Sequence, residues 1–166
     1  MTIKTIFLDR DGVINKETGY LHKIEDFKFI NGVFEACQHY EQLGYKIVIV
    51  TNQSGISRGH YSEDDFRNIT DWMITQFNKN NIQILDTFHC PHSPISKCDC
   101  RKPKPGMILE AISSNNLKYN ECIMIGDSLK DIEAANSAGI DVLLLETGYN
   151  NHILFNSKIK SLISLI

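Results

Sequence analysis

The sequence predicts an α/β protein in which helices cover both faces of a doubly wound parallel sheet. Short apolar runs alternate with segments whose apolar residues recur at helical spacing. Parallel strands are covered on both faces, so they appear as continuous apolar runs. The predicted order is strand, helix, strand, helix, strand, loop, helix, strand, helix, strand, which is typical of a parallel sheet with crossover helices.

The five predicted strands are short runs dominated by isoleucine, leucine, valine and phenylalanine. Such side chains fit the pleated, buried surface of a sheet. We expect the strands at residues 5–8, 46–50, 82–88, 122–125 and 141–145.

The predicted helices combine apolar periodicity with residues that start or end helices. Gly44 is typical of a helix end, because glycine adopts the left-handed backbone that closes the last turn. Ser62 followed by Asp65 is a variant of the capping box that opens a helix. A terminal helix is expected to pack on its own domain rather than on a membrane surface. Helices are expected over residues 33–43, from Ser62 through residue 77, from Pro105 to about residue 115, up to Gly139, and within residues 153–166.

The overall composition predicts one domain and excludes several classes of partner. The chain has 166 residues, 42% of them hydrophobic, and a net charge of −3, which suits a single domain over residues 1–166. Duplex-binding proteins usually carry a basic surplus, so we expect no nucleic acid partner. No apolar run approaches the roughly 18 residues of a membrane span, and no signal-peptide pattern opens the chain. We therefore expect a cytoplasmic monomer without a membrane partner.

Three predicted strands each end in a polar side chain that could take part in catalysis: Asp9, Thr51 and Asp127. Doubly wound sheets place their ligand site in the crevice beyond the carboxyl ends of the strands. An isolated Asp-x-Asp or Gly-Asp is more often a solvated turn. Three separate segments that direct polar groups to one crevice favour a functional site instead.

These residue types suit phosphoryl transfer. The reaction needs a nucleophile, an acid for the leaving oxygen, and positive charge around the phosphoryl oxygens. Asp9 can serve as the nucleophile, and Asp11 can protonate the leaving alkoxide and then activate water. Repulsion among Asp9, Asp11 and Asp127 calls for a hard divalent cation, and we predict magnesium.

Further polar groups are expected to bind the phosphoryl group. Thr51 and the backbone of Asn52 and Gln53 can bind its oxygens. Lys102 can stabilise the charge that develops in the transition state. Asp131, one helical turn after Asp127, is expected to orient the other carboxylates and the metal without binding the metal directly.

Residues 90–100 contain three of the five cysteines. In a reducing compartment this crowding predicts metal binding rather than disulfides. Three thiolates and one imidazole suit a tetrahedral structural zinc without an open coordination position. His89 is the alternative imidazole, and Cys37 and Cys122 are expected in the core. The predicted zinc ligands are Cys90, His92, Cys98 and Cys100.

The predicted zinc loop leads directly into two cations, Arg101 and Lys102. A loop with few apolar residues cannot become ordered by burial, but a metal can order it. We expect the zinc to hold both cations at the edge of the site, where Arg101 can form a fork with a second phosphate or a substrate hydroxyl.

The motifs around these residues resemble those of the haloacid dehalogenase superfamily of phosphatases. The resemblance covers nearly the whole chain to about residue 147. It implies a Rossmann-like, capless fold, with Asp9 as nucleophile, Asp11 as acid and base, and magnesium held by Asp9, Asp11 and Asp127. The matching segments are residues 9–13 (DRDGV), the strand that ends in Thr51 and Asn52, Lys102, and residues 126–131 (GDSLKD).

Within the superfamily, the cysteine loop and residues 101–107 resemble two groups. One removes the C7 phosphate of D-glycero-D-manno-heptose 1,7-bisphosphate, supplying heptose 1-phosphate for nucleotide-activated heptose of lipopolysaccharide or capsule; the other hydrolyses histidinol phosphate. Residues 19–27 and 51–59 are similar to the heptose group, so a small phosphorylated sugar is the expected substrate. This similarity implies substrate contacts from Asp9, Arg10, Asp11, Glu17, Thr18, Gly19, Tyr20, Thr51, Asn52, Gln53, Ser54, Arg101, Lys102 and Ser128.

Two functions of other kinds stay open. A zinc-stabilised interaction module would use the cysteine loop for docking and leave the carboxylates idle, but the complete catalytic set argues against it. A capless protein phosphatase would admit large substrates. Arg101, Lys102 and the loop at residues 19–20 favour a small anionic sugar instead.

Overall fold

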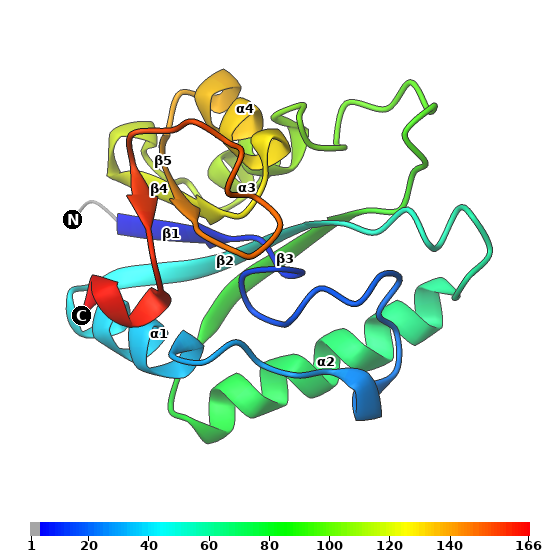
Figure 1. The fold of residues 1–166 in the computed structure, drawn as a ribbon, viewed down its shortest axis with the longest axis horizontal. Helices are drawn as coiled ribbons and strands as arrows, with labels where there is room; N and C mark the ends of the chain where they lie inside the picture. The colour runs from blue at the N-terminus through cyan, green and yellow to red at the C-terminus, as the bar shows by residue number, and fades with distance from the viewer. Residues whose placement is uncertain (1–3) are drawn as a thin grey trace.

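The computed structural model describes residues 4–166, and its centre is one sheet of six parallel strands (Figure 1). The strand order is β3-β2-β1-β4-β5-β6, so the direction of winding reverses between β1 and β4. Ligand sites of such sheets lie beyond the carboxyl ends of the strands at this switch point. The strands are β1 (Lys4–Leu8), β2 (Tyr45–Asn52), β3 (Ile84–Cys90), β4 (Cys122–Gly126), β5 (Asp141–Leu145) and β6 (Lys158–Ile159).

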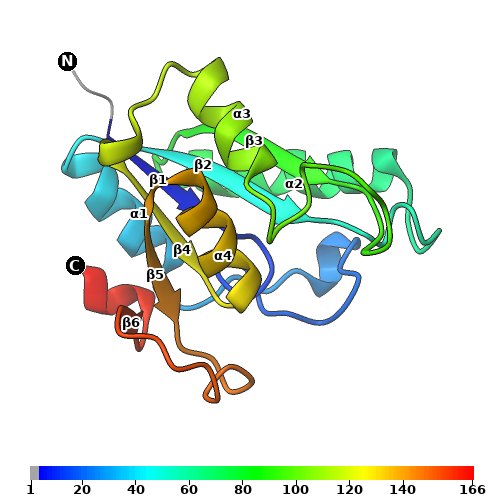
Figure 2. The same cartoon turned by 90° about the horizontal axis from the view of Figure 1, so that it is seen from above.

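Helices cover both faces of the sheet, which confirms the predicted doubly wound architecture. Helices α1 and α2 lie on one face, and α3 and α4 lie on the other (Figures 1 and 2). Their bounds are α1 (Val33–Gln42), α2 (Glu63–Lys79), α3 (Gly106–Ser114) and α4 (Leu129–Ala138), with short 3-10 turns η1 (Ile24–Asp26), η2 (Tyr119–Glu121) and η3 (Leu162–Leu165).

Alternation along the central strands builds the two cores. In β1, Ile6 and Leu8 pack in the core under α1 and α2, whereas Phe7 between them packs in the core under α3 and α4. All three side chains are buried. Burial on both faces explains why β1 appears in the sequence as a continuous apolar run.

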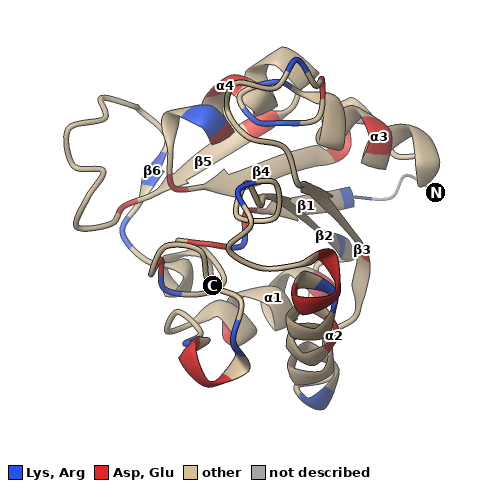
Figure 3. Cartoon of the chain, turned by 90° about the vertical axis from the view of Figure 1, so that its right-hand side faces the viewer, with Lys and Arg blue, Asp and Glu red and all other residues tan. Residues whose placement is uncertain are grey.

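The predicted helix ends are largely confirmed. At the start of α2, Asp65 N donates to Ser62 Oγ over 3.1 Å and Ser62 N donates to Asp65 Oδ2 over 2.8 Å, which completes the capping box. Figure 3 shows the acidic first turn of α2 in red, at the helix end where negative charge is favourable. Gly44 and Gly139 both have positive φ after a helix. Pro105 is the N-cap of α3 and precedes its first turn.

The helix predicted near the C-terminus is wrong. Residues Lys158–Ile159 instead add strand β6 to the edge of the sheet, with Leu144 N donating to Ser157 O over 2.9 Å and Glu146 N donating to Ile159 O over 2.8 Å. The expected packing on the domain itself is confirmed, because Leu162 of η3 is buried in the core beside α1. Pairing with a distant strand has overridden the local apolar spacing.

None of the helices within residues 4–166 has both the length and the apolar character needed to cross a membrane. The first three residues, on which the expectation of no signal peptide partly depends, lie outside the described residues.

Candidate active site

A cavity of about 290 Å³ lies beyond the carboxyl ends of β1, β2 and β4, at the switch point of the sheet. The strand-end residues Asp9 and Asp127 line it, together with cations from the loop that follows β3. Three strands therefore meet where the sequence predicted. The cavity is lined by Asp9, Asp11, Glu17, Asn52, Arg101, Lys102, Asp127, Ser128, Lys130, Asp131 and Tyr149.

Lys102 is the buried cation of this site. Its Nζ lies 2.9 Å from Asp9 Oδ1 and 2.7 Å from Asp131 Oδ1, and it donates to Val50 O over 3.0 Å. Burial alone would lower the pKa of Lys102, but Asp131 and Asp9 raise that pKa above its ordinary value. The lysine therefore stays charged beside the carboxylate predicted to be the nucleophile.

The peptide of Lys102 is fixed by one side chain of β2. Asn52 Oδ1 accepts from Lys102 N, and Asn52 Nδ2 donates to Lys102 O, each over 3.0 Å. This pair of hydrogen bonds attaches the loop after β3 to the end of the neighbouring strand.

Three carboxylates gather next to the lysine. Oxygens of Asp9, Asp127 and Asp131 lie within 4.8 Å of one another. Burial raises the pKa of Asp9 well above its ordinary value, although Lys102 lowers it in part. Such a group of oxygens suits a hard divalent cation that offsets their repulsion.

Within this group, Asp131 has the orienting role that the sequence predicted. Its Oδ2 accepts from Asp127 N over 3.0 Å, Ser128 N over 3.1 Å and Ser128 Oγ over 2.9 Å. Its Oδ1 is paired with Lys102. Because both oxygens are occupied, Asp131 holds the turn after β4 and leaves Asp9 and Asp127 to face a metal.

Gly12 allows the backbone of the first loop to lie directly against Asp127. This residue has a φ of 91°, and a Cβ at this position would collide with Asp127 Oδ2 and the Tyr149 hydroxyl. The backbone of the first loop therefore approaches Asp127 more closely than any side chain would allow. The carboxylates of Asp9 and Asp127 are the residues here that could hold a divalent cation.

Two residues that the sequence analysis missed fix Asp127. The Tyr149 hydroxyl donates to Asp127 Oδ2, and Asn150 Nδ2 donates to Asp127 O and to Leu145 O over 2.8 Å each. Burial raises the pKa of Asp127 to about 6, although the Tyr149 hydrogen bond acts in the opposite direction. Both residues lie in the loop after β5, four and five residues beyond its last residue Leu145, so the strand-end rule that found Asp9 does not reach them.

The side chain of Asp11 lies apart from the other carboxylates. Arg10 Nη2 donates to Asp11 Oδ1 over 2.9 Å, Asn15 Nδ2 donates to Oδ1 over 3.0 Å, and Gln53 Nε2 donates to Oδ2 over 3.0 Å. Of the three predicted magnesium ligands, the structure thus brings the side chains of Asp9 and Asp127 together. The carboxylate of Asp11 is held at the wall of the cavity.

A second cavity of about 210 Å³ adjoins the first and contains most of the predicted substrate loop. The two cavities share Asp11, Glu17 and Asn52. Leu21 and Tyr61 are wall residues that the sequence analysis did not identify, because only the path of the loops brings them there. The second cavity is lined by Asp11, Glu17, Gly19, Tyr20, Leu21, Asn52, Gln53, Ser54, Gly55 and Tyr61.

Three residues with predicted substrate contacts line neither cavity. Arg10 is 1% exposed and turned toward Asp11. Thr51 is buried, and its Oγ1 accepts from Gln53 Nε2 over 2.8 Å. Thr18 faces a separate cavity of about 510 Å³ on the outer side of the same loop. Arg10 and Thr51 thus support the wall rather than form its surface.

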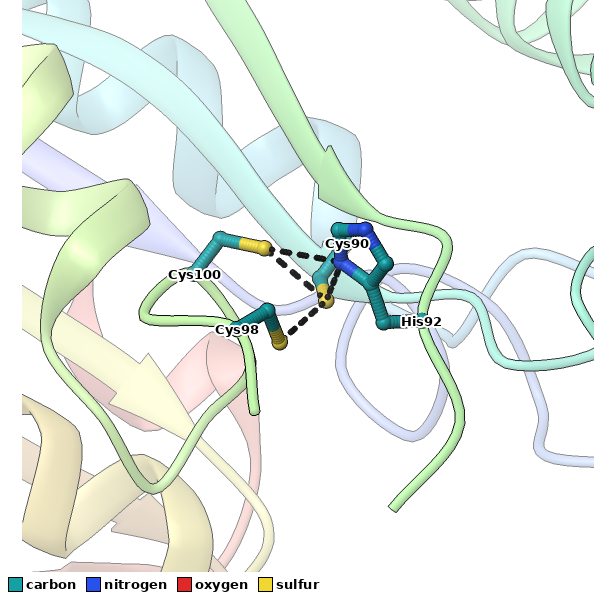
Figure 4. A group of neighbouring side chains, drawn as sticks. All are labelled: Cys90, His92, Cys98 and Cys100. Atoms are coloured by element: carbon teal, nitrogen blue, oxygen red, sulfur yellow. Dashed lines mark hydrogen bonds between the residues drawn. The ribbon is translucent and has the colours of Figure 1, made fainter. Parts of the chain in front are cut away.

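The four predicted ligands of the cysteine loop point toward one another (Figure 4). Cys90 Sγ lies 3.8 Å from Cys98 Sγ and 3.1 Å from Cys100 Sγ. His92 Nδ1 lies 3.4 Å from Cys90 Sγ and 3.3 Å from Cys100 Sγ. Sulfur atoms around one tetrahedral zinc, each about 2.3 Å from it, lie about 3.8 Å apart. The cluster therefore fits a single metal ion.

The alternative imidazole is engaged elsewhere, since His89 Nε2 lies 3.0 Å from Glu63 Oε2. Cys37 and Cys122 are buried in the two cores, as predicted. The loop also holds Arg101, whose Nη1 donates to His92 O over 3.2 Å while its side chain lines the first cavity.

Comparisons with known sequences identify relatives along most of the chain. Residues 99–158 match the HAD-hydrolase-like family model. The chain is 47% identical over 145 residues to the D-glycero-alpha-D-manno-heptose-1,7-bisphosphate 7-phosphatase of Campylobacter jejuni, covering 87% of this chain and 83% of that protein. It is 45% identical over 152 residues to the D-glycero-beta-D-manno-heptose-1,7-bisphosphate 7-phosphatase of Pasteurella multocida, with the same coverage.

A solved structure has the same fold. The D,D-heptose 1,7-bisphosphate phosphatase of B. bronchiseptica, in complex with magnesium and phosphate, has a TM-score of 0.89 and 30% sequence identity, and the match covers 96% of this chain and 94% of that one. The strand-end carboxylates and the buried lysine of this chain are consistent with the family that these similarities indicate. The chain belongs to the heptose-1,7-bisphosphate 7-phosphatase family of haloacid-dehalogenase-like hydrolases.

Proposed function

We propose that this protein removes the C7 phosphate of D-glycero-D-manno-heptose 1,7-bisphosphate and releases heptose 1-phosphate. The contact that carries the proposal is the 2.9 Å ion pair between Lys102 Nζ and Asp9 Oδ1 at the wall of a cavity that Arg101 also lines. The ion pair places the nucleophile Asp9 beside Lys102. It leaves Arg101 free to bind the second phosphate of a bisphosphate. The product would enter the synthesis of nucleotide-activated heptose for lipopolysaccharide or capsule.

The reaction proceeds in two balanced steps. A carboxylate oxygen of Asp9 attacks phosphorus, the bond from phosphorus to the C7 oxygen breaks, and Asp11 gives its proton to the leaving alkoxide. Water then attacks the aspartyl-phosphate and passes its proton to Asp11. The bond to Asp9 breaks and inorganic phosphate leaves. Lys102 stabilises the negative charge on the transferring group.

Magnesium is the proposed cofactor of this site. Asp9 and Asp127 would hold it, and it would neutralise charge on the phosphoryl oxygens. The related structure from B. bronchiseptica, which is described as complexed with magnesium and phosphate, supports this choice.

We expect magnesium affinity to depend on pH. Burial raises the pKa of Asp127 to about 6, so below that pH the metal-free carboxyl binds a proton that magnesium must displace. The Kd for magnesium should therefore rise by up to about tenfold for each unit of pH below about 6. Titrations of activity with magnesium after EDTA treatment test this, and zinc alone should not restore turnover. Tyr149→Phe, which removes a bond that lowers this pKa, should move the transition to higher pH, whereas a constant Kd would contradict the prediction.

Zinc is the proposed metal of the cysteine loop. Three thiols and one imidazole are ligands that zinc prefers, and their ligand atoms all lie within 4.8 Å of one another. The loop then acts as a structural support for Arg101.

Metal analysis of the purified protein should give about one zinc per chain, the stoichiometry of a single tetrahedral site. Cys100→Ser should lower that content, with Cys122→Ser in the core as the matched control. Because the loop holds Arg101, the variant should raise the KM for the heptose bisphosphate more than the KM for p-nitrophenyl phosphate. A zinc-free protein with full stability and unchanged KM values would overturn the zinc assignment.

The substrate assignment is tested by kcat/KM for the heptose bisphosphate, in both anomers, against histidinol phosphate and a phosphopeptide. We expect the heptose to be preferred and ³¹P NMR to show loss of the C7 phosphate with the C1 phosphate retained. Histidinol phosphate carries a single phosphate, so it offers Arg101 in the cavity lining no second anionic group. Faster hydrolysis of histidinol phosphate, or initial loss of the C1 phosphate, would overturn the assignment and leave the phosphatase chemistry in place.

We further propose that residues 1–166 act as one capless, monomeric phosphatase domain in the cytoplasm. Thiols stay reduced in that compartment, as the free cysteines of the proposed zinc site require.

A further inference from the structure

The orientation of the Asp11 carboxylate depends on the amide of Gln53. Gln53 is buried, and its Nε2 donates both to Asp11 Oδ2 over 3.0 Å and to Thr51 Oγ1 over 2.8 Å. Asp11 Oδ2 is the acceptor of this bond, and an acceptor oxygen requires a donor opposite it. The NH₂ end of the amide must therefore face Asp11, since the opposite orientation would set two acceptors against each other.

Tyr61 selects this orientation of the amide. Its hydroxyl donates to Gln53 Oε1, the end of the amide that points away from Asp11. Burial raises the pKa of Tyr61 to about 12, so the hydroxyl keeps its proton at neutral pH. A continuous line of donors runs from the Tyr61 hydroxyl through the amide to the carboxylate.

The tyrosine ring is itself fixed. Tyr61 is 7% exposed and stacks on His22, with ring centroids 5.2 Å apart and planes at 12°. On another side it lies so close to Gly55 that a Cβ at that position would collide with the ring. A rigid ring with a single buried hydroxyl is suited to hold a neighbouring amide in one orientation.

We propose that Tyr61 is a positioning residue for the general acid Asp11 and acts through Gln53. The inference rests on the proposed function, because Asp11 is the group that protonates the leaving oxygen. Without the hydroxyl, the amide of Gln53 can turn, and Asp11 loses one of the bonds that define its direction. The rate of phosphoryl transfer should then fall most for substrates whose leaving group most needs a proton.

Two aryl phosphates of similar size separate positioning from sugar binding. Phenol is a far weaker acid than p-nitrophenol, so phenyl phosphate needs protonation of its leaving oxygen and p-nitrophenyl phosphate scarcely does. Because kcat/KM reports only the steps up to transfer of phosphate to Asp9, it measures how much the first step depends on protonation of the leaving oxygen. Tyr61→Phe should lower kcat/KM about tenfold for phenyl phosphate and less than about twofold for p-nitrophenyl phosphate.

Two further variants complete the test. Tyr119→Phe alters an exposed tyrosine of η2, at the opposite end of β4 from the site, and should leave both values unchanged. Gln53→Leu removes the same connection and should change the ratio of the two kcat/KM values in the same direction. The double variant should match Gln53→Leu alone, because the two side chains act in series.

The outcomes distinguish a failure of the role of Tyr61 from a failure of the proposed function. Equal losses on both aryl phosphates, or no loss, would overturn the role of Tyr61, as would full additivity in the double variant. An effect confined to KM for the heptose bisphosphate would make Tyr61 a sugar contact instead. If the wild-type protein hydrolyses no phosphate monoester, the heptose bisphosphate included, the proposed function fails and this inference fails with it. Thermal unfolding of Tyr61→Phe checks folding, and Gln53→Leu carries the test if that variant is unstable.

Discussion

The Asp9→Asn protein should fold normally and release no measurable phosphate from any monoester. An amide oxygen is not a nucleophile, and removing the attacking group of a covalent mechanism costs about 10⁴-fold or more in rate. Folding should be preserved, because a neutral side chain relieves repulsion from Asp127 and Asp131 while Lys102 keeps its ion pair with Asp131. Phosphate release and thermal unfolding, measured on the same preparation, test both parts.

Asp11→Asn is the informative comparison for this variant. It keeps the nucleophile, so p-nitrophenyl phosphate should still phosphorylate Asp9 and give a burst of p-nitrophenol followed by very slow turnover. Asp26→Asn, on the exposed turn η1, is the control without an expected effect. Near-normal activity of Asp9→Asn at matched folding would show that the mechanism is not covalent.

Lys102→Met should damage both stability and catalysis. The ammonium group of Lys102 is buried between Asp9 and Asp131, and removing one partner of a buried ion pair typically costs about 3–5 kcal/mol of unfolding free energy. Loss of a group that stabilises transition-state charge should lower kcat by a further factor of about 10²–10³. Lys104→Met, an exposed lysine two residues away, should change neither quantity appreciably.

Urea unfolding and phosphate release measure the two effects of Lys102→Met separately. Magnesium should recover part of the lost stability, since a bound cation replaces some of the missing positive charge. A variant that loses activity but keeps its full stability would show that Lys102 is not the counter-ion of the buried carboxylates.

The sequence predicted five strands well because buried parallel strands are continuous apolar runs. It ended β2 and β3 too early, at residues 50 and 88, because the residues that continue them to Asn52 and Cys90 are mainly polar. Their pairing depends on the neighbouring strand, as the register between Thr51 and His89 shows. Strand β6 also depends on a distant partner, so the sequence did not predict it and a helix was predicted there instead.

The sequence predicted the site residues that lie at strand ends. It did not predict the contacts that depend on the path of a loop. Asp9 and Asp127 meet as expected because parallel strands finish at one edge, and Lys102 joins them from the loop after β3. The turn of the Asp11 carboxylate toward Arg10 and Asn15 depends on how residues 9–15 fold back, which no spacing rule describes. The role of Tyr61 likewise depends on a contact between two loops.

The paired hydrogen bonds between Asn52 and the Lys102 peptide attach this lysine to the end of β2 by contacts separate from the cysteine cluster. Insertions or deletions in the segment between Cys90 and Cys100 can alter what Arg101 presents to a substrate while Nζ of Lys102 stays beside Asp9. We therefore expect reaction chemistry and substrate choice to be separable in this fold. Loops exchanged among relatives should transfer specificity without rebuilding the catalytic centre.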